Sequence, residues 1–238
     1  MTTPGIAAHT SSQFSAELDD MRQHVLTMGG LVEQQLELAV RALIESDADL
    51  ALEVAASEQK VNDFETFIDD ECARILARRQ PTASDLRLVY AIIKTITDLE
   101  RMGDESNKIA RMAVSLAHQG LPGMETVAIQ HLARHVIQMV HDALDALARM
   151  DADAALATAR ADQTVDREYE ALLRQCITFM MEDPRSIRRV MDIIWSVRAL
   201  ERIGDHARNI AEYVIYYVKG RDVRHVSMDE MERAVKGR

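Results

Sequence analysis

The chain has 238 residues, an apolar fraction of 47% and a formal net charge of −11. Such a length suffices for one large or two ordinary domains, and the apolar fraction can fill real cores. The acidic balance, without a concentrated basic cluster, argues against broad nucleic-acid binding and favours a protein partner. Aromatic residues make up only 4%, with 9 glycines and 4 prolines, so the composition favours helices over strands.

The lack of signal-peptide and membrane-span features in the sequence indicates the cellular compartment. The N-terminal segment has no apolar core of signal-peptide length, and the most apolar runs, such as residues 213–218, fall far short of a membrane span. Cys72 and Cys176 show no metal-type spacing, which is typical of packed thiols in a reducing compartment. The sequence therefore predicts a cytoplasmic protein.

Capping signals and periodicity define the expected helices in chain order. Asp47 and Asp151 are expected N-caps, and Asp183 places a cap directly before a proline at the first helical position. Gly220 is the expected stop of the last long helix. Residues 1–15 are expected to be disordered, and a capping box at residues 227–230 predicts a short surface helix in the C-terminal tail. The predicted long helices span residues 16–46, 48–79, 84–118, 125–150, 152–182 and 185–219.

An internal repeat organises the chain. Leu-Glu-Arg-Met-Gly-Asp at residues 99–104 recurs as Leu-Glu-Arg-Ile-Gly-Asp at 200–205, an offset of 101, whereas upstream matches such as Cys72 with Cys176 have an offset of 104. The slip falls at the loops that hold Pro81 and Pro184, where a bundle tolerates a length change. The sequence thus predicts an all-α fold of two tandem three-helix bundles, with six long antiparallel helices, related by the internal repeat. The predicted bundles are residues 16–121 and 122–220, followed by a tail at 221–238.

Each copy of the repeat carries a glutamate and an aspartate one helical turn apart, Glu100 with Asp104 and Glu201 with Asp205. If Leu200 faces the core, the second pair lies roughly 100° to 140° around the helix, outside the apolar stripe. Like charges at this spacing disfavour a helix by about 0.2 to 0.5 kcal/mol, and a mid-helix glycine costs about 1 kcal/mol. A bound cation would relieve the acids, and close helix approach would explain the glycine before each aspartate.

Further acidic pairs on the second and fifth predicted helices could converge with these. Their registers disagree, because at the 104 offset Asp166 aligns with Asn62 and Glu170 with Thr66. Oxygen-rich ligands favour Mg, Mn or Fe, with Zn less favoured. The alternative is a solvated face with local ion pairs, which is common on charged helices. The candidate metal ligands are Glu100, Asp104, Glu201, Asp205, Asp166, Glu170, Glu65 and Asp69.

Motifs of enzymes are missing from the sequence. No nucleophile elbow, glycine-rich phosphate loop or His-Glu-x-x-His motif occurs. A carboxylate-bridged metal-binding bundle with oxidoreductase or metal-storage activity remains the alternative function. Ferritin-like sites, however, project Glu and Glu-x-x-His ligands into the bundle core, a histidine spacing that these pairs lack.

The doubled Glu-Arg-hydrophobic-Gly-Asp segment, together with residues 78–87 and 216–220, resembles the PhoU family across essentially the whole chain. The resemblance implies tandem three-helix bundles, a homodimer and multinuclear metal sites on Glu/Asp-x-x-x-Asp motifs. It also implies a non-enzymatic adaptor between the phosphate ABC transporter, through its ATPase subunit, and a sensor histidine kinase. Such an adaptor would repress the phosphate regulon and phosphate uptake, and would meet the membrane only through its partners.

The two copies of the repeat differ at one point close to the acidic pairs. His206 and Asn209 of the second copy are replaced by Glu105 and Lys108 in the first. Lys108, one turn beyond Asp104, could itself neutralise that carboxylate. We therefore expect the first copy to be the weaker metal site.

Overall fold

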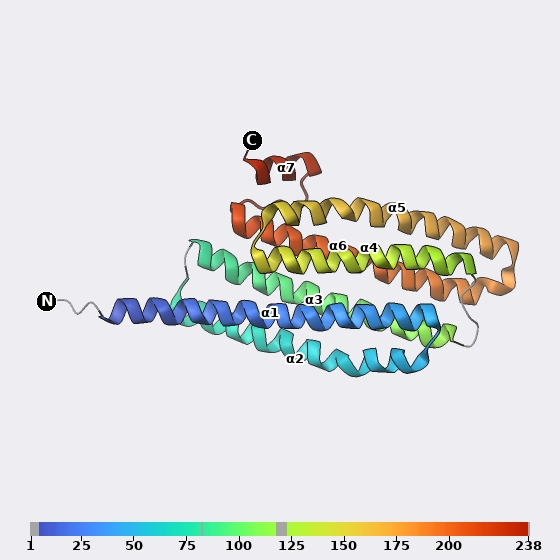
Figure 1. Cartoon of the computed structure of the whole chain (residues 1–238), viewed down its shortest axis with the longest axis horizontal. Coiled ribbons are helices and arrows are strands. Elements are labelled where there is room, and N and C mark those ends of the chain that lie inside the picture. Colours follow the sequence, from blue (N-terminus) through green and yellow to red (C-terminus); the bar gives the residue numbers. More distant parts are fainter. Residues whose placement is uncertain (1–4, 82, 118–122, 238) are drawn as a thin grey trace.

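The computed structural model describes residues 5–81, 83–117 and 123–237, and within these ranges all regular secondary structure is helical (Figure 1). The six long helices lie along one long axis of the molecule. A single 3-10 turn, η1 (Pro184–Ser186), precedes the sixth. The helices are α1 (Gly5–Glu45), α2 (Ala48–Arg79), α3 (Ala83–Leu116), α4 (Gly123–Arg149), α5 (Ala152–Glu182), α6 (Ile187–Lys219) and the short α7 (Met228–Lys236).

Local capping fixes most of the helix boundaries. The side chains of Asp47 and Asp151 each accept hydrogen bonds from two backbone amides at the start of α2 and α5. Gly220 ends α6 in the left-handed region at φ 67°, where glycine pays no steric penalty. The predicted spans of α2 and α5 are confirmed without change, and those of α3, α4 and α6 agree within two residues at each end. The capping box before α7 is confirmed too.

Helix α1 departs from the prediction at its N-terminus. It begins at Gly5, not at residue 16, so residues 5–15 extend the first helix. Neither glycine nor proline occurs between residues 6 and 28, and the backbone meets nothing that would stop a helix. Residues 1–4 lie outside the described part of the chain. The expected break at Pro122, and with it the boundary between the two predicted bundles, also lies outside it.

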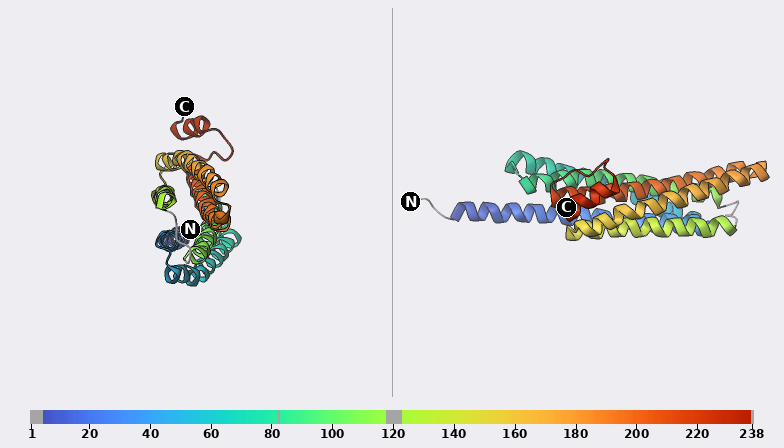
Figure 2. Two further views of the ribbon diagram at one scale, coloured as in Figure 1. Left: turned by 90° about the vertical axis from the view of Figure 1, so that its right-hand side faces the viewer. Right: turned by 90° about the horizontal axis from the view of Figure 1, so that it is seen from above.

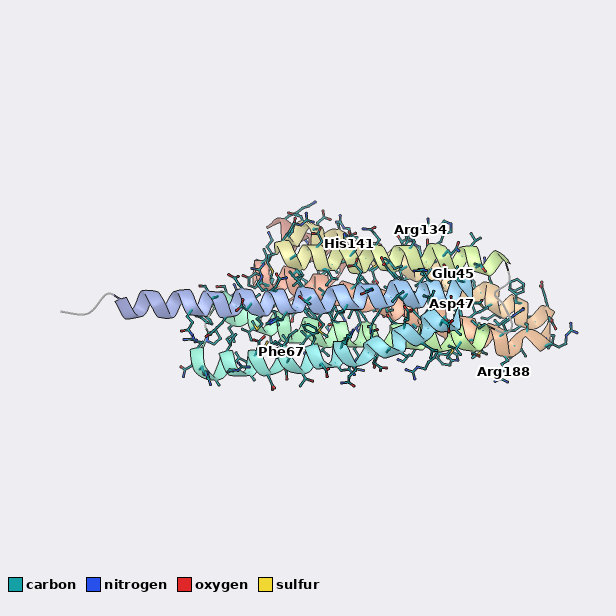
Figure 3. The ribbon with its side chains drawn as sticks, turned by 60° about the horizontal axis from the view of Figure 1, so that its bottom comes forward. Glu45, Asp47, Phe67, Arg134, His141 and Arg188 are labelled. Atoms are coloured by element: carbon teal, nitrogen blue, oxygen red, sulfur yellow. The ribbon has the colours of Figure 1, made fainter. Side chains whose placement is uncertain are left out.

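The two bundles lie side by side and run in opposite directions. In Figure 1, α3 runs antiparallel to its repeat equivalent α6, and α1 to α4; the contact between α3 and α6 is the most extensive of any two helices. Viewed end on in Figure 2, α2 and α5 lie on the outer sides of this arrangement. His141 of α4 approaches Glu33 of α1, with Nδ1 2.9 Å from Oε1 (Figure 3). Buried apolar side chains from both bundles form one continuous core.

Each mid-helix glycine of the repeat lies where two helices approach closely. A Cβ added at Gly103 would lie 3.5 Å from Cγ1 of Val61, and one added at Gly204 would lie 3.3 Å from Cγ1 of Val165. Val61 and Val165 are themselves equivalent at the 104 offset. The same glycine-to-valine contact therefore joins α2 to α3 and α5 to α6. At Gly204 the valine is the tight neighbour, whereas at Gly103 the tight neighbour is Oε1 of Gln35 on α1, 3.2 Å from an added Cβ.

The prediction that each half can fold alone follows from the complete copy of the repeat in each. Expressed separately, residues 1–121 and residues 122–238 should each be helical by circular dichroism and melt cooperatively. Because separation exposes the face of α3 or α6 that the other half covers, each half should also self-associate in sedimentation velocity. Cooperative melting of the whole chain, with none in either half, would contradict the prediction.

Candidate functional site

The second bundle gathers four acidic side chains between α5 and α6. Glu201 and Asp205 lie on α6, and the charges that act on them include those of Asp162 and Asp166 on α5. Glu201 is 9% exposed and Asp162 only 2%. Glu201 is therefore more buried than its position beside the apolar stripe predicted, because α5 packs on this side of α6. The charge of Asp166 on α5 acts on both members of the α6 pair.

Burial and mutual repulsion shift the titration of these acids. Burial, followed by the charge of Asp205, raises the pKa of Glu201 to about 7. Loss of solvation raises the pKa of Asp205 as well, with a further contribution from the charges of Asp162 and Asp166. The pKa of Asp166 is raised by burial and then by Asp162. A group of acids that resists full ionisation would be relieved by a cation.

Two arginines neutralise part of this charge. Nη1 of Arg198 lies 2.8 Å from Oε1 of Glu201, and Nη1 of Arg208 lies 2.9 Å from Oδ2 of Asp162. The other oxygens of the two carboxylates, Oε2 of Glu201 and Oδ1 of Asp162, are buried without a hydrogen-bond partner. A buried carboxylate oxygen without a partner is costly, so both acids have acceptor capacity left for a cation.

The ligand types of this cluster suit a metal ion better than their arrangement does. Carboxylate oxygens without partners suit a hard cation such as Mg²⁺ or Mn²⁺. Across the described ranges, however, no three His, Cys, Asp or Glu side chains are arranged so that they could hold one ion. Coordination would need side-chain rotation at the more exposed members, Asp205 and Asp166.

The first bundle carries the equivalent acidic cluster in a more open setting. Burial and then the charge of Asp104 raise the pKa of Glu100, whose side chain is 23% exposed and lies 3.5 Å from Arg101. The pKa of Glu65 is raised by burial, then by Glu100 and Asp69. The structure thus brings Glu65 of α2 to the α3 pair, although its register differs from that of the second bundle, whereas Asp69 acts on Glu65 from one turn further along α2.

Glu170 stands apart from the other predicted ligands. Its side chain is 65% exposed and lies 3.6 Å from Arg174 on the same helix. This arrangement is the local ion pair that the alternative interpretation predicted for these acids. Glu170 is the member of the predicted set that fits a solvated face best.

Lys108 does not do what the sequence suggested. Its Nζ lies 2.8 Å from Oε1 of Glu105, and Nη1 of Arg202 lies 2.9 Å from the same oxygen. Glu105 is 3% exposed, so this buried carboxylate attracts both cations and draws Lys108 away from Asp104. The charge of Lys108 thus helps to neutralise Glu105 at the contact between α3 and α6.

The replacement of Glu105 by His206 in the second copy builds a second polar contact between the same helices. Nδ1 of His206 lies 2.6 Å from Oδ1 of Asp98, and Nδ2 of Asn209 donates to the same oxygen at 3.0 Å. Asp98 is 7% exposed. The charge of His206 also acts on Glu100 and on Asp205, so this histidine lies between the two acidic clusters.

Sequence reasoning missed Glu58 and Asp162, one from each bundle. Asp162 acts on Glu201 and Asp205, and Glu58 acts on Glu100. The two are equivalent at the 104 offset, next to the matching Gln59 and Gln163. Extending the repeat by one position would have found the α2 and α5 acids that obey its register.

Comparison with known proteins places the whole chain in one family. The PhoU domain matches twice, over residues 25–113 and 129–214. The phosphate-specific transport system accessory protein PhoU homolog of Pseudomonas aeruginosa is 55% identical over 96% of this chain and 94% of its own length. The accessory protein PhoU of Escherichia coli K12 is 49% identical over 100% of this chain and 98% of its own.

Solved structures agree with this placement. The crystal structure of PhoU from Pseudomonas aeruginosa has a TM-score of 0.85 at 56% identity, covering 87% of this chain and all of that one. That of the phosphate transport system regulatory protein PhoU from Streptococcus pneumoniae has a TM-score of 0.82 at 31% identity, over 88% and 99%. Within the described part, no helix is long and apolar enough to cross a membrane. The chain belongs to the PhoU family of phosphate-specific transport system accessory proteins, a non-enzymatic family.

Proposed function

We propose that this protein represses phosphate uptake and the phosphate-responsive genes, as a cytoplasmic adaptor between the phosphate ABC transporter and its sensor histidine kinase. The observation that carries the proposal is the full-length similarity to the Escherichia coli phosphate-specific transport system accessory protein. A non-enzymatic family does not fit the oxidoreductase alternative.

The fold suits an adaptor because the repeat offers two similar but unequal faces. One bundle would contact the transporter's ATPase subunit and the other the kinase, each as part of a homodimer. Transport state would then reach the kinase through differential binding. A coupling of about 1 to 3 kcal/mol, or roughly 5- to 150-fold in affinity, is typical for two linked sites and would suffice.

The regulatory proposal is tested by deleting the gene. A reporter driven by a phosphate-scavenging promoter should be active at high phosphate in the deletion strain, as though the cell were starved. A plasmid copy of the wild-type gene should restore repression. Unchanged repression in the deletion strain, with no second copy of the gene in the genome, would refute the proposal.

We also propose that a divalent or ferric ion binds the acidic cluster of the second bundle, with weaker binding in the first. Glu201, Asp205, Asp162 and Asp166 would supply oxygen ligands, and the ion would neutralise a cluster whose pKa values are raised. What supports the stronger site here is the pair of buried carboxylate oxygens without partners. In the first bundle the corresponding glutamate, Glu100, is more exposed.

Metal content tests this second proposal. Protein purified without an affinity tag should lose most of its bound Mn²⁺ when Glu201→Ala and Asp205→Ala are combined, while its helix content by circular dichroism stays unchanged. Glu170→Ala, at the exposed acid paired with Arg174, is the matched control and should keep wild-type metal content. Equal metal in the double variant and the wild type would reject the site.

A further inference from the structure

An open apolar groove runs between the first half of α2 and the last half of α3. Leu52 is 64% exposed and Val114 42% exposed on its two sides, and Ala55 and Ala110 line the space between them. The groove has a volume of about 360 Å³. It lies near the turn between α1 and α2, where Figure 3 labels Glu45 and Asp47.

The repeat-equivalent surface of the second bundle is covered. Leu156, Ala159 and Ile215, the equivalents of Leu52, Ala55 and Val114, are at most 4% exposed. Helix α7 contacts both α5 and α6 and lies along the outside of α5 (Figures 1 and 2). Its two apolar side chains, Met231 and Val235, are at most 3% exposed. One bundle thus has a helix on this surface, whereas the other leaves it open.

A buried polar side chain at the edge of the open groove also lacks a partner. Asn107 is 3% exposed and lines the groove, yet neither its Oδ1 nor its Nδ2 has a hydrogen-bond partner. Its equivalent in the covered bundle, Arg208, pairs with Asp162 at 2.9 Å and with Glu212 at 3.1 Å. Since a buried amide without partners is costly, Asn107 would gain the hydrogen bonds that it lacks by turning toward a molecule bound in the groove.

We propose that this groove binds an amphipathic helix of a partner protein, with two aliphatic side chains one turn apart and a carboxylate directed at Arg111. The helical form and the spacing follow from α7, whose Met231 and Val235 are buried where that helix contacts α5 and α6. The carboxylate follows from charge, because exposed Arg111 occupies the position that Glu212 has in the second bundle. Helix-in-groove binding of this kind uses anchors at positions i and i+4.

The charges argue against α7 of a second copy as the occupant. Arg160 of α5 pairs with Glu232 of α7, and the position equivalent to Arg160 in the first bundle is Ala56. The open groove therefore lacks the cation that holds α7; it has its own cation, Arg111, on the opposite helix α3, and an acid, Glu58, on the α2 side. Its preferred helix must be acidic on the α3 side.

The test uses two fluorescent peptides made from residues 226–237 of this chain and the full-length protein. In the acidic peptide, Arg233 and Lys236 are replaced by Glu; in the basic peptide, Asp229 and Glu232 are replaced by Lys. Fluorescence anisotropy should show the acidic peptide binding at least tenfold more tightly than the basic one. Arg111→Glu should reverse this order, a result that a merely sticky apolar surface would not give.

Location is tested by charges placed within the groove. Leu52→Glu combined with Val114→Glu should weaken binding of the acidic peptide at least tenfold, whereas Met181→Glu, at an exposed apolar residue outside the groove, should leave it unchanged. Binding by neither peptide, or equal binding to the groove variant, would overturn the proposal. So would loss of self-association on Leu52→Glu in sedimentation velocity, since a second copy would then be the occupant. The assay contains no phosphate or kinase, so its outcome is independent of the proposed regulatory function.

Discussion

Replacing Glu201 with Gln should stabilise the metal-free protein at pH 8 by on the order of 2 to 3 kcal/mol. Burial and Asp205 raise the pKa of Glu201 from 4.5 to about 7 in the folded protein. Between these values the folded state holds a proton that the unfolded state has lost. The contribution of Glu201 to stability is therefore most favourable below pH 4.5, falls as the pH rises to 7, and stays unfavourable above it.

Glutamine copies the protonated carboxyl and does not ionise, so the difference between variant and wild type should be small at pH 5 and large at pH 8. Urea denaturation in the presence of a chelator at both pH values measures it. Part of the gain is offset by loss of the ion pair with half-exposed Arg198. Glu170→Gln, at an exposed site, is the control and should change little. A Glu201→Gln effect that is the same at both pH values would contradict the raised pKa.

The caps and the repeat are local signals, and the sequence was therefore a good guide to the fold. An aspartate such as Asp151 caps its helix through backbone amides two and three residues away, which needs no tertiary information. The close approach at Gly204 was predictable for a similar reason, since the glycine falls within a regular apolar stripe. The start of α1 is the exception, because composition alone does not distinguish a helical segment such as residues 5–15 from a disordered one.

The candidate site was less predictable because its chemistry arises between helices. The position of Glu201 on α6 placed it beside the core, but its 9% exposure depends on α5. Lys108 has Asp104 and Glu105 within reach along its own helix, and only the approach of Arg202 from α6 reveals which carboxylate is buried. Helix α7 was expected on the surface, yet Met231 is buried because α7 packs against α5 and α6.

Contacts that occur once in the molecule are invisible to a search for repeats, and Asp98 is the clearest case. Its equivalent in the second copy is Ala199, so the repeat gives no reason to single it out. Yet Asp98 lies at the contact between α3 and α6 and accepts hydrogen bonds from His206 and Asn209. It joins the two bundles at a position where they differ.

Replacing Asp98 with Ala should therefore destabilise the whole chain by about 3 to 5 kcal/mol, because His206 and Asn209 would lose the buried carboxylate that they share. For a chain of this size, that loss lowers the melting temperature by roughly 6 to 20 °C. Asp98→Asn, which keeps an acceptor oxygen for Asn209, should have an intermediate effect. Asp63→Ala, at an exposed aspartate of α2, is the control and should shift the melting temperature little.

The shape of the melting curve carries a second result. If the contact between α3 and α6 couples the bundles, calorimetry of the wild-type protein should show one unfolding transition. Asp98→Ala should lower the temperature of that transition or split it in two. Splitting would mean that the bundles still fold separately once the contact is weakened. A melting temperature equal to that of Asp63→Ala would contradict the role of Asp98, since a carboxylate that stabilises the contact between α3 and α6 cannot be removed without loss of stability.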